Sequence, residues 1–264
     1  MSTKCLIGAC IYNAEEWLSM SLNNLDKIKA LFPEYKIVFS YDDSTDNSLK
    51  ILSEYQNKDD RVKIIINNAP LFSMRSVNIA TARNKILKEL TDEYFMIMLD
   101  MNYTNIQSFQ PEILTKYLYR DDWDCLTFNR KDYYDIWALS IKPYYISMWH
   151  WEKPDKVKGV MKDYIENTLK EMPDDRLLKC ISAFGGFGIY KVSKFKGCKY
   201  TGLYDLDPFF RLKLNLEDNR KILKSISDTP GEYKPVDCEH KYFHMEAIEK
   251  HKARIRICKE ILFV

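Results

Sequence analysis

Phe95-Met96-Ile97-Met98-Leu99-Asp100-Met101-Asn102 is the most informative stretch of this 264-residue chain. Its unbroken apolar run predicts a strand buried on both faces, as in a parallel sheet covered by helices. Asp100 and Asn102 then place two oxygen ligands at the carboxyl edge of that sheet, where open α/β folds bind ligands. Such oxygens suit a hard divalent cation that carries a diphosphate. The alternative is that Asp100 only caps the following turn.

The composition restricts the class of protein. Apolar residues make up 46% of the chain, enough for one large domain or two small ones. Lys and Arg number 40 against 38 Asp and Glu, so the net charge of +2 gives no argument for nucleic acid or an anionic membrane as partner. Seven cysteines without a Cys-x-x-Cys pair argue against a disulfide framework or structural zinc. Without a signal-peptide pattern or an 18-residue apolar window, we expect a soluble cytoplasmic protein, in the host cytoplasm if it is viral.

Strands and helices alternate through the first hundred residues. Together with residues 95–100, the apolar segments predict a β-α-β-α-β-α-β order and thus a parallel sheet with right-handed crossovers. The predicted strands are residues 5–12, 36–41 and 62–66, and the predicted helices are 14–31, about 49–55 and 74–90. The fold class is therefore α/β, Rossmann-like, with a mostly parallel central sheet flanked by helices.

The pattern is looser after Asn102, where we expect a smaller C-terminal sheet. A strand over 181–190 is interrupted by glycines, which often mark a bulge or close backbone approach to a ligand. The other predicted elements are helices at 111–119, 155–169 and 242–252, strands at 124–128 and 136–139, and a last strand or docked segment at 255–264.

Several nucleotide and hydrolase motifs are absent. The chain has no Gly-x-Gly-x-x-Gly after its first strand, no P-loop and no Gly-x-Ser-x-Gly. It has instead acids at the strand ends: Asp42 and Asp43 close the second predicted strand, and Asp100 closes the fourth. In a parallel sheet these lie along one edge, where a carboxylate can accept from a nucleobase N–H or a ribose hydroxyl. Alternatively, the acids at 42–46 cap a helix N-terminus.

Six short segments spread over the chain resemble, in order, motifs of nucleotide-sugar glycosyltransferases with the GT-A fold. The first four are similar to the Y-N-x-E-x-x-L, D-D-x-S-x-D, A-R-N and D-x-D motifs of glycosyltransferase family 2. The last two resemble its glycine-rich acceptor-side strand and its E-D position. In chain order the segments are Ile11–Leu18, Tyr41–Ser48, Ala82-Arg83-Asn84, Leu99–Asn102, Phe184–Tyr190 and Cys238-Glu239-His240.

A second resemblance is to the capsule mannosyltransferase family 69 and its viral and bacterial relatives. It rests on Arg75-x7-Arg83-Asn84, Tyr134-Asp135-x-Trp137-Ala138-Leu139 and Cys238-Glu239-His240. Both resemblances imply one GT-A domain over residues 1–264. Residues 1–105 would bind the nucleotide sugar and residues 106–264 the acceptor.

The resemblance implies roles for the residues at the sheet edge. Asp43 would contact the nucleobase with Tyr12 and Asp42 nearby, and Arg75 and Arg83 would approach the nucleobase or diphosphate. Asp100 would also contact the nucleotide sugar.

The resemblance also implies a Mn²⁺ or Mg²⁺ site made by Asp100, Asn102 and His240. The metal would neutralise the leaving diphosphate. The family usually has Asp where this chain has Asn102, which keeps an oxygen ligand but removes a charge. Strict metal dependence is therefore open. A single His such as His240 is also commonly structural.

For catalysis and acceptor binding, alternatives remain open. Glu239 would be the general base of an inverting reaction, or simply an acid in the first turn of a helix. Asp205 and Asp207 are competing carboxylates, although Asp207 before a proline is more typical of a turn. Asp135 would bind the acceptor or act catalytically, or, as an acid at a strand edge, it can equally be structural. Gly185, Gly186 and Trp149 would face the acceptor. Trp149 clusters in the sequence with Tyr144 and Trp151, as sugar-stacking rings or as core residues.

These residues together predict a metal-dependent glycosyltransferase, expected to be a hexosyltransferase. It would move a sugar from a UDP- or GDP-linked donor to a hydroxyl of a glycan or glycoconjugate. A degenerate GT-A domain that binds nucleotide sugar or glycan without turnover is the alternative, and Asn102 favours it. A nucleotidyltransferase would need a glycine-rich basic loop after the first strand, which this chain lacks.

Overall fold

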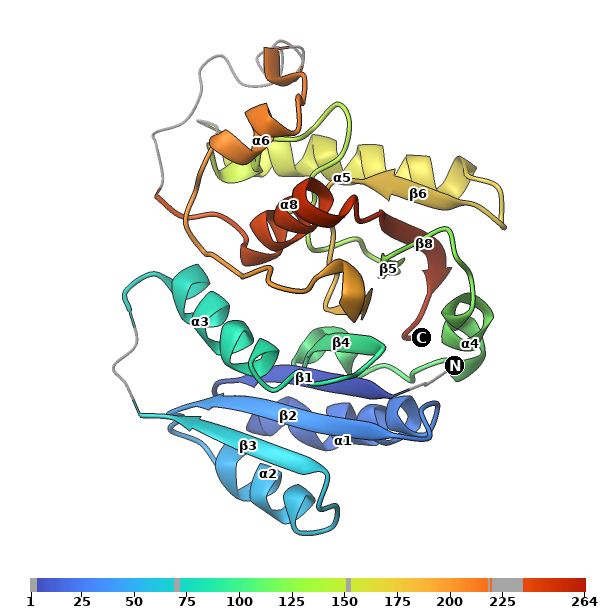
Figure 1. The fold of residues 1–264 in the computed structure, drawn as a ribbon. Helices are drawn as coiled ribbons and strands as arrows, with labels where there is room; N and C mark the ends of the chain where they lie inside the picture. The colour runs from blue at the N-terminus through green and yellow to red at the C-terminus, as the bar shows by residue number, and fades with distance from the viewer. Residues whose placement is uncertain (1–3, 69–71, 151–152, 218, 220–234) are drawn as a thin grey trace.

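The protein, seen in a computed structural model, has one eight-stranded sheet with the order β3-β2-β1-β4-β7-β5-β8-β6 (Figure 1). The structure describes residues 4–68, 72–150, 153–217, 219 and 235–264. The strands are β1 Cys5–Ile11, β2 Tyr35–Asp42, β3 Val62–Asn67, β4 Phe95–Asp100, β5 Cys125–Asn129, β6 Leu177–Cys180, β7 Phe187–Lys191 and β8 Ile255–Ile261. The helices are α1 Glu15–Lys29, α2 Ser48–Gln56, α3 Arg75–Leu87, α4 Pro111–Leu118, α5 Pro154–Glu171, α6 Asp207–Arg211 and α8 Glu239–His251.

The first four strands form the parallel part of the sheet, as the sequence predicts. β1 pairs in parallel with both β2 and β4, and β3 pairs in parallel with β2. The predicted alternation of strands and helices through α3 is confirmed. Because the strands are parallel, the carboxyl ends of β1, β2 and β4 meet at one edge.

The strands of the second half extend this same sheet, so the expectation of a separate smaller sheet is wrong. β7 inserts antiparallel between β4 and β5, and β8 pairs in parallel with β5 and antiparallel with β6. The predicted strand at 136–139 is also wrong, since the chain turns there. The predicted strand at 181–190 retains only its end as β7, because Gly185 and Gly186 adopt positive φ and turn the chain.

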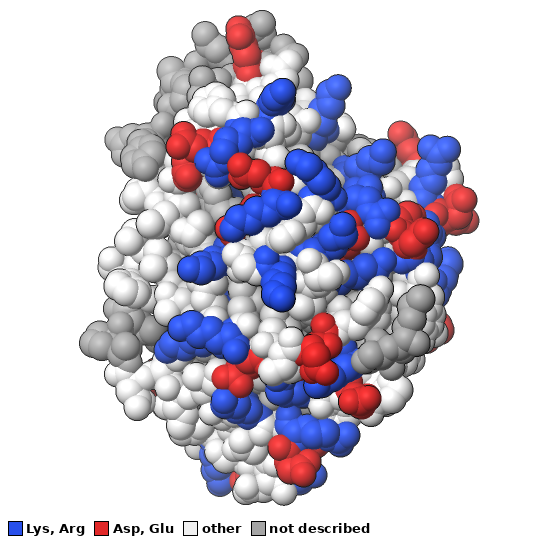
Figure 2. All heavy atoms as spheres, in the orientation of Figure 1, with Lys and Arg blue, Asp and Glu red and all other residues white. Residues whose placement is uncertain are grey.

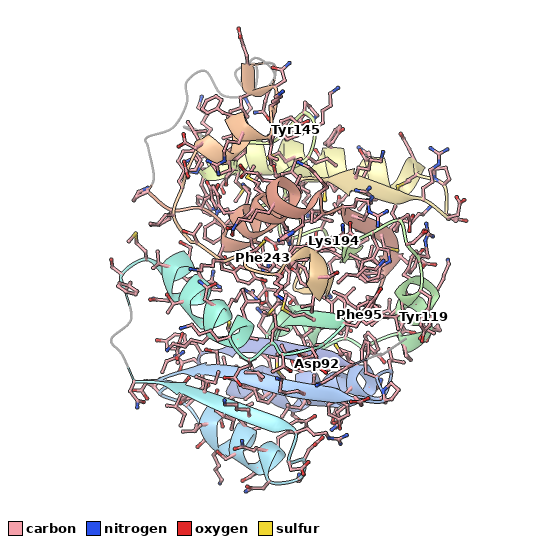
Figure 3. The ribbon with its side chains drawn as sticks, viewed as in Figure 1. Asp92, Phe95, Tyr119, Tyr145, Lys194 and Phe243 are labelled. Carbon is pink, nitrogen blue, oxygen red and sulfur yellow. The ribbon has the colours of Figure 1, made fainter. Side chains whose placement is uncertain are left out.

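Side chains of the central strands alternate between two cores, one on each face of the sheet. In β4, Phe95, Ile97 and Leu99 pack in one core, while Met96 and Met98 pack in the other. The first core also takes in α1, α2 and α4, and the second takes in α3, α5, α6 and α8. Figure 3 labels Phe95 of the first core and Phe243, on α8, of the second. Burial on both faces explains the continuous apolar run of β4.

The surface carries mixed charge. Lysines and arginines are spread over the face seen in Figure 2, with aspartates and glutamates among them. In the part of the chain that the structure describes, no helix combines the length and apolarity that crossing a membrane requires. All seven cysteines are free.

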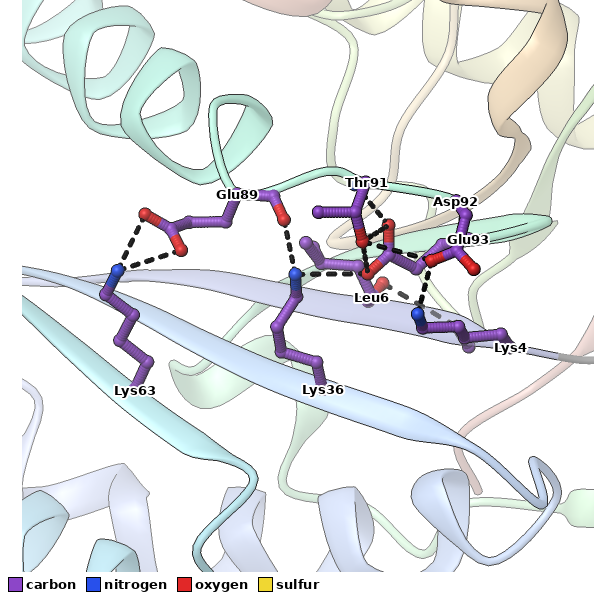
Figure 4. Close-up of polar contacts among 9 residues, drawn as sticks. Lys4, Leu6, Lys36, Lys63, Glu89, Thr91, Asp92 and Glu93 are labelled. Atoms are coloured by element: carbon purple, nitrogen blue, oxygen red, sulfur yellow. Dashed lines mark hydrogen bonds and ion pairs between the residues drawn. The ribbon is translucent and has the colours of Figure 1, made fainter.

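A line of ion pairs fastens the turn between α3 and β4 to the strands below it (Figure 4). Lys4, before β1, pairs with Asp92, and Lys63 of β3 pairs with Glu89 at 2.9 Å. Between them Lys36 of β2 pairs at 3.1 Å with Glu93, whose side chain is fully buried. This turn sets the start of β4.

Glu93 is held by more than its lysine. Its carboxylate accepts a hydrogen bond of 2.6 Å from the backbone N–H of Thr91. Burial raises the pKa of Glu93, but this bond and the Lys36 ion pair outweigh burial and hold the pKa below its ordinary value. A lowered folded-state pKa stabilises the fold above the ordinary glutamate range, and that stabilisation is lost as pH falls through the lowered pKa.

We therefore expect Glu93→Ala to lower the free energy of unfolding at pH 7 by about 1–3 kcal/mol, because it leaves the Thr91 N–H without its acceptor and Lys36 without its ion-pair partner. The matched control Glu89→Ala removes an exposed pair and costs at most about 1 kcal/mol. Urea denaturation at pH 7 and pH 3 measures both, and the difference between the variants shrinks at pH 3. Equal losses at pH 7 would contradict this account.

Candidate functional site

A cavity of about 740 Å³ lies at the carboxyl ends of β1, β2 and β4, between the two halves of the chain. It is lined by residues from loops and helices that are distant in sequence. Ten residues that the sequence singled out are among them: Tyr12, Asp42, Arg75, Arg83, Asp100, Asn102, Asp135, Trp149, Glu239 and His240. The predicted residues Asp43, Gly185, Gly186 and Asp205 do not line it.

At one end of the cavity, the loops after β1 and β2 lock together through the polar side chains of their motifs. Asn13 accepts from the backbone N–H of Thr45 at 2.8 Å. Ser48 and Asp46 accept from the N–H groups of Ala14 and Glu15 at 2.8 and 2.9 Å, so the second loop caps the start of α1. Many polar side chains of these two motifs therefore accept hydrogen bonds from backbone N–H groups.

Two side chains of this end remain available to a ligand. Tyr12 is 54% exposed, and Asp42 accepts a hydrogen bond from Asn67. Burial raises the pKa of Asp42, opposed by the Asn67 hydrogen bond and by Lys85. Asp43 is exposed and is not among the residues that line the cavity, so its contact with a nucleobase stays a prediction.

The centre of the cavity is a buried ion-pair bridge. Arg83, on α3 and only 3% exposed, donates from Nε to Glu239 Oε1 and from Nη2 to Asp100 Oδ1, both at 3.0 Å. Its guanidinium lies 4.8 Å from the ring centre of Phe184. The two carboxylates come from different halves of the chain, so Arg83 joins those halves at the site.

The neighbouring Asn84 has a structural task. Its side chain both donates to the carbonyl of Tyr200 and accepts from the Tyr200 N–H, each at 2.9 Å. This clamp holds the 200 loop against α3. In the Ala82-Arg83-Asn84 motif, Arg83 therefore reaches the cavity and Asn84 fixes the wall.

Several hydrogen bonds hold the loop after Asp100, and Asn102 takes part in them. Asn102 Oδ1 accepts from the Thr104 N–H at 3.0 Å and from the Thr104 hydroxyl at 2.6 Å, which caps a short 3-10 helix. Asn105, fully buried, donates to the carbonyls of Asp100 and Gly186. The amide oxygen predicted to bind a metal is thus already hydrogen-bonded.

Gly185 and Gly186 lie behind the cavity and shape its wall. Gly185 N–H donates to Asp135 at 3.1 Å, and the Gly186 carbonyl accepts from the Asp100 N–H at 2.9 Å. Gly186 has φ of +80°, and a Cβ there would stand 2.7 Å from Thr104 Oγ1. These bonds place two acids, and the role of the two glycines at the acceptor stays a prediction.

Arg130 completes this wall and was not found from the sequence. It donates to the carbonyls of Gly185 and Thr104 at 2.8 and 2.7 Å, and also to the Asn105 side chain. A single guanidinium thereby fixes the glycine loop to the loop that carries Asp100. No motif marks Arg130, because its partners are mostly carbonyl groups whose position depends on the fold.

Asp135 is the acid with the most altered pKa in the cavity. Burial raises its pKa to about 6, although hydrogen bonds from the N–H groups of Ala138 and Gly185 oppose the rise. Asp100 and Glu239 add to it as nearby negative charges. An acid with such a pKa can exchange a proton near neutral pH.

His240 is 1% exposed and stacks on Phe184 with ring centres 3.7 Å apart. Burial, with Arg83 and His244 as further causes, places the pKa of His240 well below its ordinary value, so the ring is neutral. Its Nε2 atom lies 3.6 Å from Glu239 Oε1. Among the described residues, no three His, Cys, Asp or Glu side chains are grouped to hold a metal ion.

The remaining predicted residues fall in different places. Asp205 is exposed and accepts from the N–H of Asp207, which makes it a turn residue. Trp149 lines the cavity and meets Trp137 edge-on at 6.1 Å. Trp151 lies outside the described residues.

Aromatic rings at the cavity mouth were also missed. Tyr103, 58% exposed, lies between Trp17 and Tyr134, with ring centres 6.3 Å from each. All three line the cavity. The signal was weak: Tyr103 follows directly on the acid-x-amide motif, but a tyrosine next to a motif has no fixed meaning.

A comparison of the sequence with protein-family models agrees with this architecture. Residues 7–160, more than half of the chain, match the model of glycosyl transferase family 2. The chain belongs to this family. No curated protein matches it.

Among solved structures, the chain is similar to S. aureus TarS. One TarS structure has 16% identity and a TM-score of 0.54, covering 98% of this chain and 36% of that one. TarS 1-349 in complex with UDP has 19% identity and a TM-score of 0.52, covering 98% and 59%. The same fragment in complex with UDP-GlcNAc has 19% identity and a TM-score of 0.50, covering 98% and 57%. The likeness shows the GT-A fold, and this chain spans less than two thirds of those chains.

The wall behind Asp100 yields a test. We expect Gly186→Ala to lower the free energy of unfolding by about 2–4 kcal/mol, because it combines a strained φ with overpacking against Thr104. Gly197→Ala is the matched control: φ is +75° there, but a Cβ meets no atom within 4 Å. It should cost only about 1–2 kcal/mol. Urea denaturation compares them, and equal losses would show that the Thr104 contact does not matter.

Proposed function

We propose that this family 2 glycosyltransferase moves a sugar, expected to be a hexose, from a UDP- or GDP-linked donor to a hydroxyl of a glycan or glycoconjugate. The observation that carries the proposal is the bridge of Asp100, Arg83 and Glu239 inside a cavity at the carboxyl edge of the sheet. In this proposal Asp100 lies on the side of the donor diphosphate and Glu239 on the side of the acceptor, and Arg83 holds the two acids close together. Ligands of open α/β sheets bind at this edge.

The charge of the cavity supports a metal-bound donor. Its lining includes four acids and three bases, and His240 is neutral. The acids are Asp42, Asp100, Asp135 and Glu239, and the bases are Arg75, Arg83 and Lys158. A diphosphate adds further negative charge, and Arg83 is already shared by two carboxylates. A divalent cation would restore the balance.

Asp100 fits a cation that is held jointly with substrate. Its side chain is 26% exposed, and Oδ1 alone bonds to Arg83. Mg²⁺ in particular is often held by one or two carboxylates, substrate phosphates and water, so a cage of three protein ligands is not needed. In this proposal Asp100 holds the Mn²⁺ or Mg²⁺, and Asn102 shapes the loop. When bound, the ion supplies Lewis-acid stabilisation to the departing diphosphate.

The other residues divide between donor and acceptor. Tyr12, Asp42 and Arg75 would bind the nucleoside end, with Arg75 exposed at the start of α3. In the opposite wall, Glu239 and Asp135 are the two candidates to accept the proton of the acceptor hydroxyl. Glu239 Oε1 is committed to Arg83, whereas Asp135 has a pKa of about 6.

Asp100→Ala tests the donor site. We expect transfer to fall at least about 100-fold, the size typical for losing an electrostatic stabiliser of a developing charge. Calorimetry should also show that Mn²⁺ no longer strengthens binding of UDP or GDP. Asp60→Ala, an exposed acid remote from the cavity, is the control and should match the wild type. Retained Mn²⁺ enhancement in Asp100→Ala would remove this acid from the metal site.

The pH profile identifies the base. If Asp135 accepts the proton, kcat/KM falls below about pH 6, because the protonated acid cannot act as a base. Asp135→Asn should then lose most of the activity, and its residual activity should no longer fall below about pH 6. Glu239→Gln should keep the fall of kcat/KM below about pH 6. The reverse pattern would assign the role to Glu239.

The hydrogen bonds of Asn102 also favour the alternative of a domain that binds nucleotide sugar without turnover. Its side-chain oxygen accepts from Thr104 and is therefore less available to a metal ion. Incubation of the protein with Mn²⁺ and a panel of UDP- and GDP-sugars separates the two functions. Release of UDP or GDP supports the transferase. Tight binding without release from any donor supports the binding module.

A further inference from the structure

Behind the cavity, four buried side chains form a chain of hydrogen-bonding contacts that ends at Glu239. Ser182 Oγ lies 3.0 Å from His244 Nδ1, and His244 Nε2 lies 3.3 Å from the Tyr190 hydroxyl. That hydroxyl lies 3.4 Å from His240 Nδ1. His240 Nε2 then faces Glu239 Oε1 at 3.6 Å, which is an electrostatic contact rather than a hydrogen bond.

Both histidines are neutral, so each carries one ring proton. Burial is the main cause in both, and the pKa of His244 falls to about 3. Each ring therefore has one N–H donor and one acceptor nitrogen. The direction in which protons are donated along the chain is then a single choice, because Tyr190 has only one proton to give.

The two ends of the chain make that choice. Glu239, paired with Arg83, accepts only, so a favourable contact with His240 requires the proton on Nε2. At the far end, His244 is the only hydrogen-bond partner of Ser182 Oγ within the described residues, so the hydroxyl proton goes to His244 Nδ1. Both ends give the same direction: Ser182 to His244, to Tyr190, to His240, to Glu239.

Two competing contacts lie beside this path. The Tyr190 hydroxyl also interacts with the Tyr200 hydroxyl, which can donate to it and leave the Tyr190 proton for His240. Cys125 Sγ is 3.8 Å from His244 Nε2. A thiol sulfur is a weak acceptor, so it can share the Nε2–H with Tyr190 without reversing the order.

We propose that Tyr190, His244 and Ser182 are positioning residues that lock His240 as its Nε2–H form, with this N–H directed at Glu239 on the cavity wall. Nothing in the reaction scheme above uses them. The consequence is chemical: His240 presents a donor, not a lone pair, and so does not ligate a metal. It instead helps to hold the Glu239 carboxylate, which Arg83 binds from another direction.

The decisive measurement is made on the protein with its native sequence. Long-range ¹H–¹⁵N NMR of the full chain labelled with ¹⁵N-histidine distinguishes protonated from unprotonated ring nitrogens, and the chain has only four histidines. We expect Nδ1 of His240 and of His244 to be unprotonated at pH 7, with His240→Gln and His244→Gln used for assignment. A proton on Nδ1 of either ring overturns the proposal. Addition of Mg²⁺, which is diamagnetic, with UDP should leave the His240 tautomer in place.

Kinetic measurements then test whether the fixed tautomer of His240 affects sugar transfer. Tyr190→Phe should lower kcat about tenfold with donor KM unchanged, and should shift the His240 Nδ1 resonance. Ser182→Ala should act in the same direction but more weakly. Tyr117→Phe is the matched control, because it removes a buried hydroxyl without a hydrogen-bond partner among the described residues. Unchanged kcat and resonance in Tyr190→Phe overturn the proposal.

This inference rests on the proposed function only for its kinetic part. If NMR shows the Nε2–H forms but no sugar is transferred, the proton order stands and the transferase proposal fails. If transfer occurs and the rings carry Nδ1–H, the transferase proposal stands and this inference fails.

Discussion

The two halves of the molecule meet at one buried guanidinium. Arg83 leaves α3 in the first half and binds Asp100 of β4 and Glu239 of α8 together. A charge with 3% exposure is tolerated only when it is paired, and loss of Arg83 would leave the buried Glu239 carboxylate without its counter-charge. The relative placement of the two walls of the cavity therefore depends on this bridge. The Asn84 clamp on Tyr200 supports it from the same helix.

Around the bridge, most polar motif residues serve the backbone. Asn102 caps the 3-10 helix that follows it, and Asp46 and Ser48, in the loop after β2, cap the start of α1. Asp135 accepts hydrogen bonds from two backbone N–H groups. A catalytic edge made of loops needs such bonds, because buried backbone groups without partners are costly.

The sequence was sufficient for the fold class, the parallel strand order and the convergence of Asp42, Arg83, Asp100 and Glu239. Each follows from local apolar runs or from motifs that lie at strand and helix ends. It was insufficient for the single continuous sheet, because the pairing of β7 with β4 joins segments far apart in the chain.

Within the site, the sequence cannot show which atoms face the cavity. Gly185, Gly186 and Asn102 belong to the expected motifs, but which of their groups face the cavity depends on side-chain and backbone partners elsewhere. Tyr190 and Arg130 carry no motif at all and became visible only through their contacts. Sequence patterns locate loops well and assign the atoms within them poorly.

The insertion of β7 between β4 and β5 has a consequence for synthesis on the ribosome. When the first hundred residues have emerged, β4 has β1 on one side and an open edge on the other. Exposed edges of apolar strands invite pairing with other chains. The edge stays open until β7 emerges, so the later chain must complete the fold that residues 1–105 begin. A shortened first half is a poor candidate for an independent fragment.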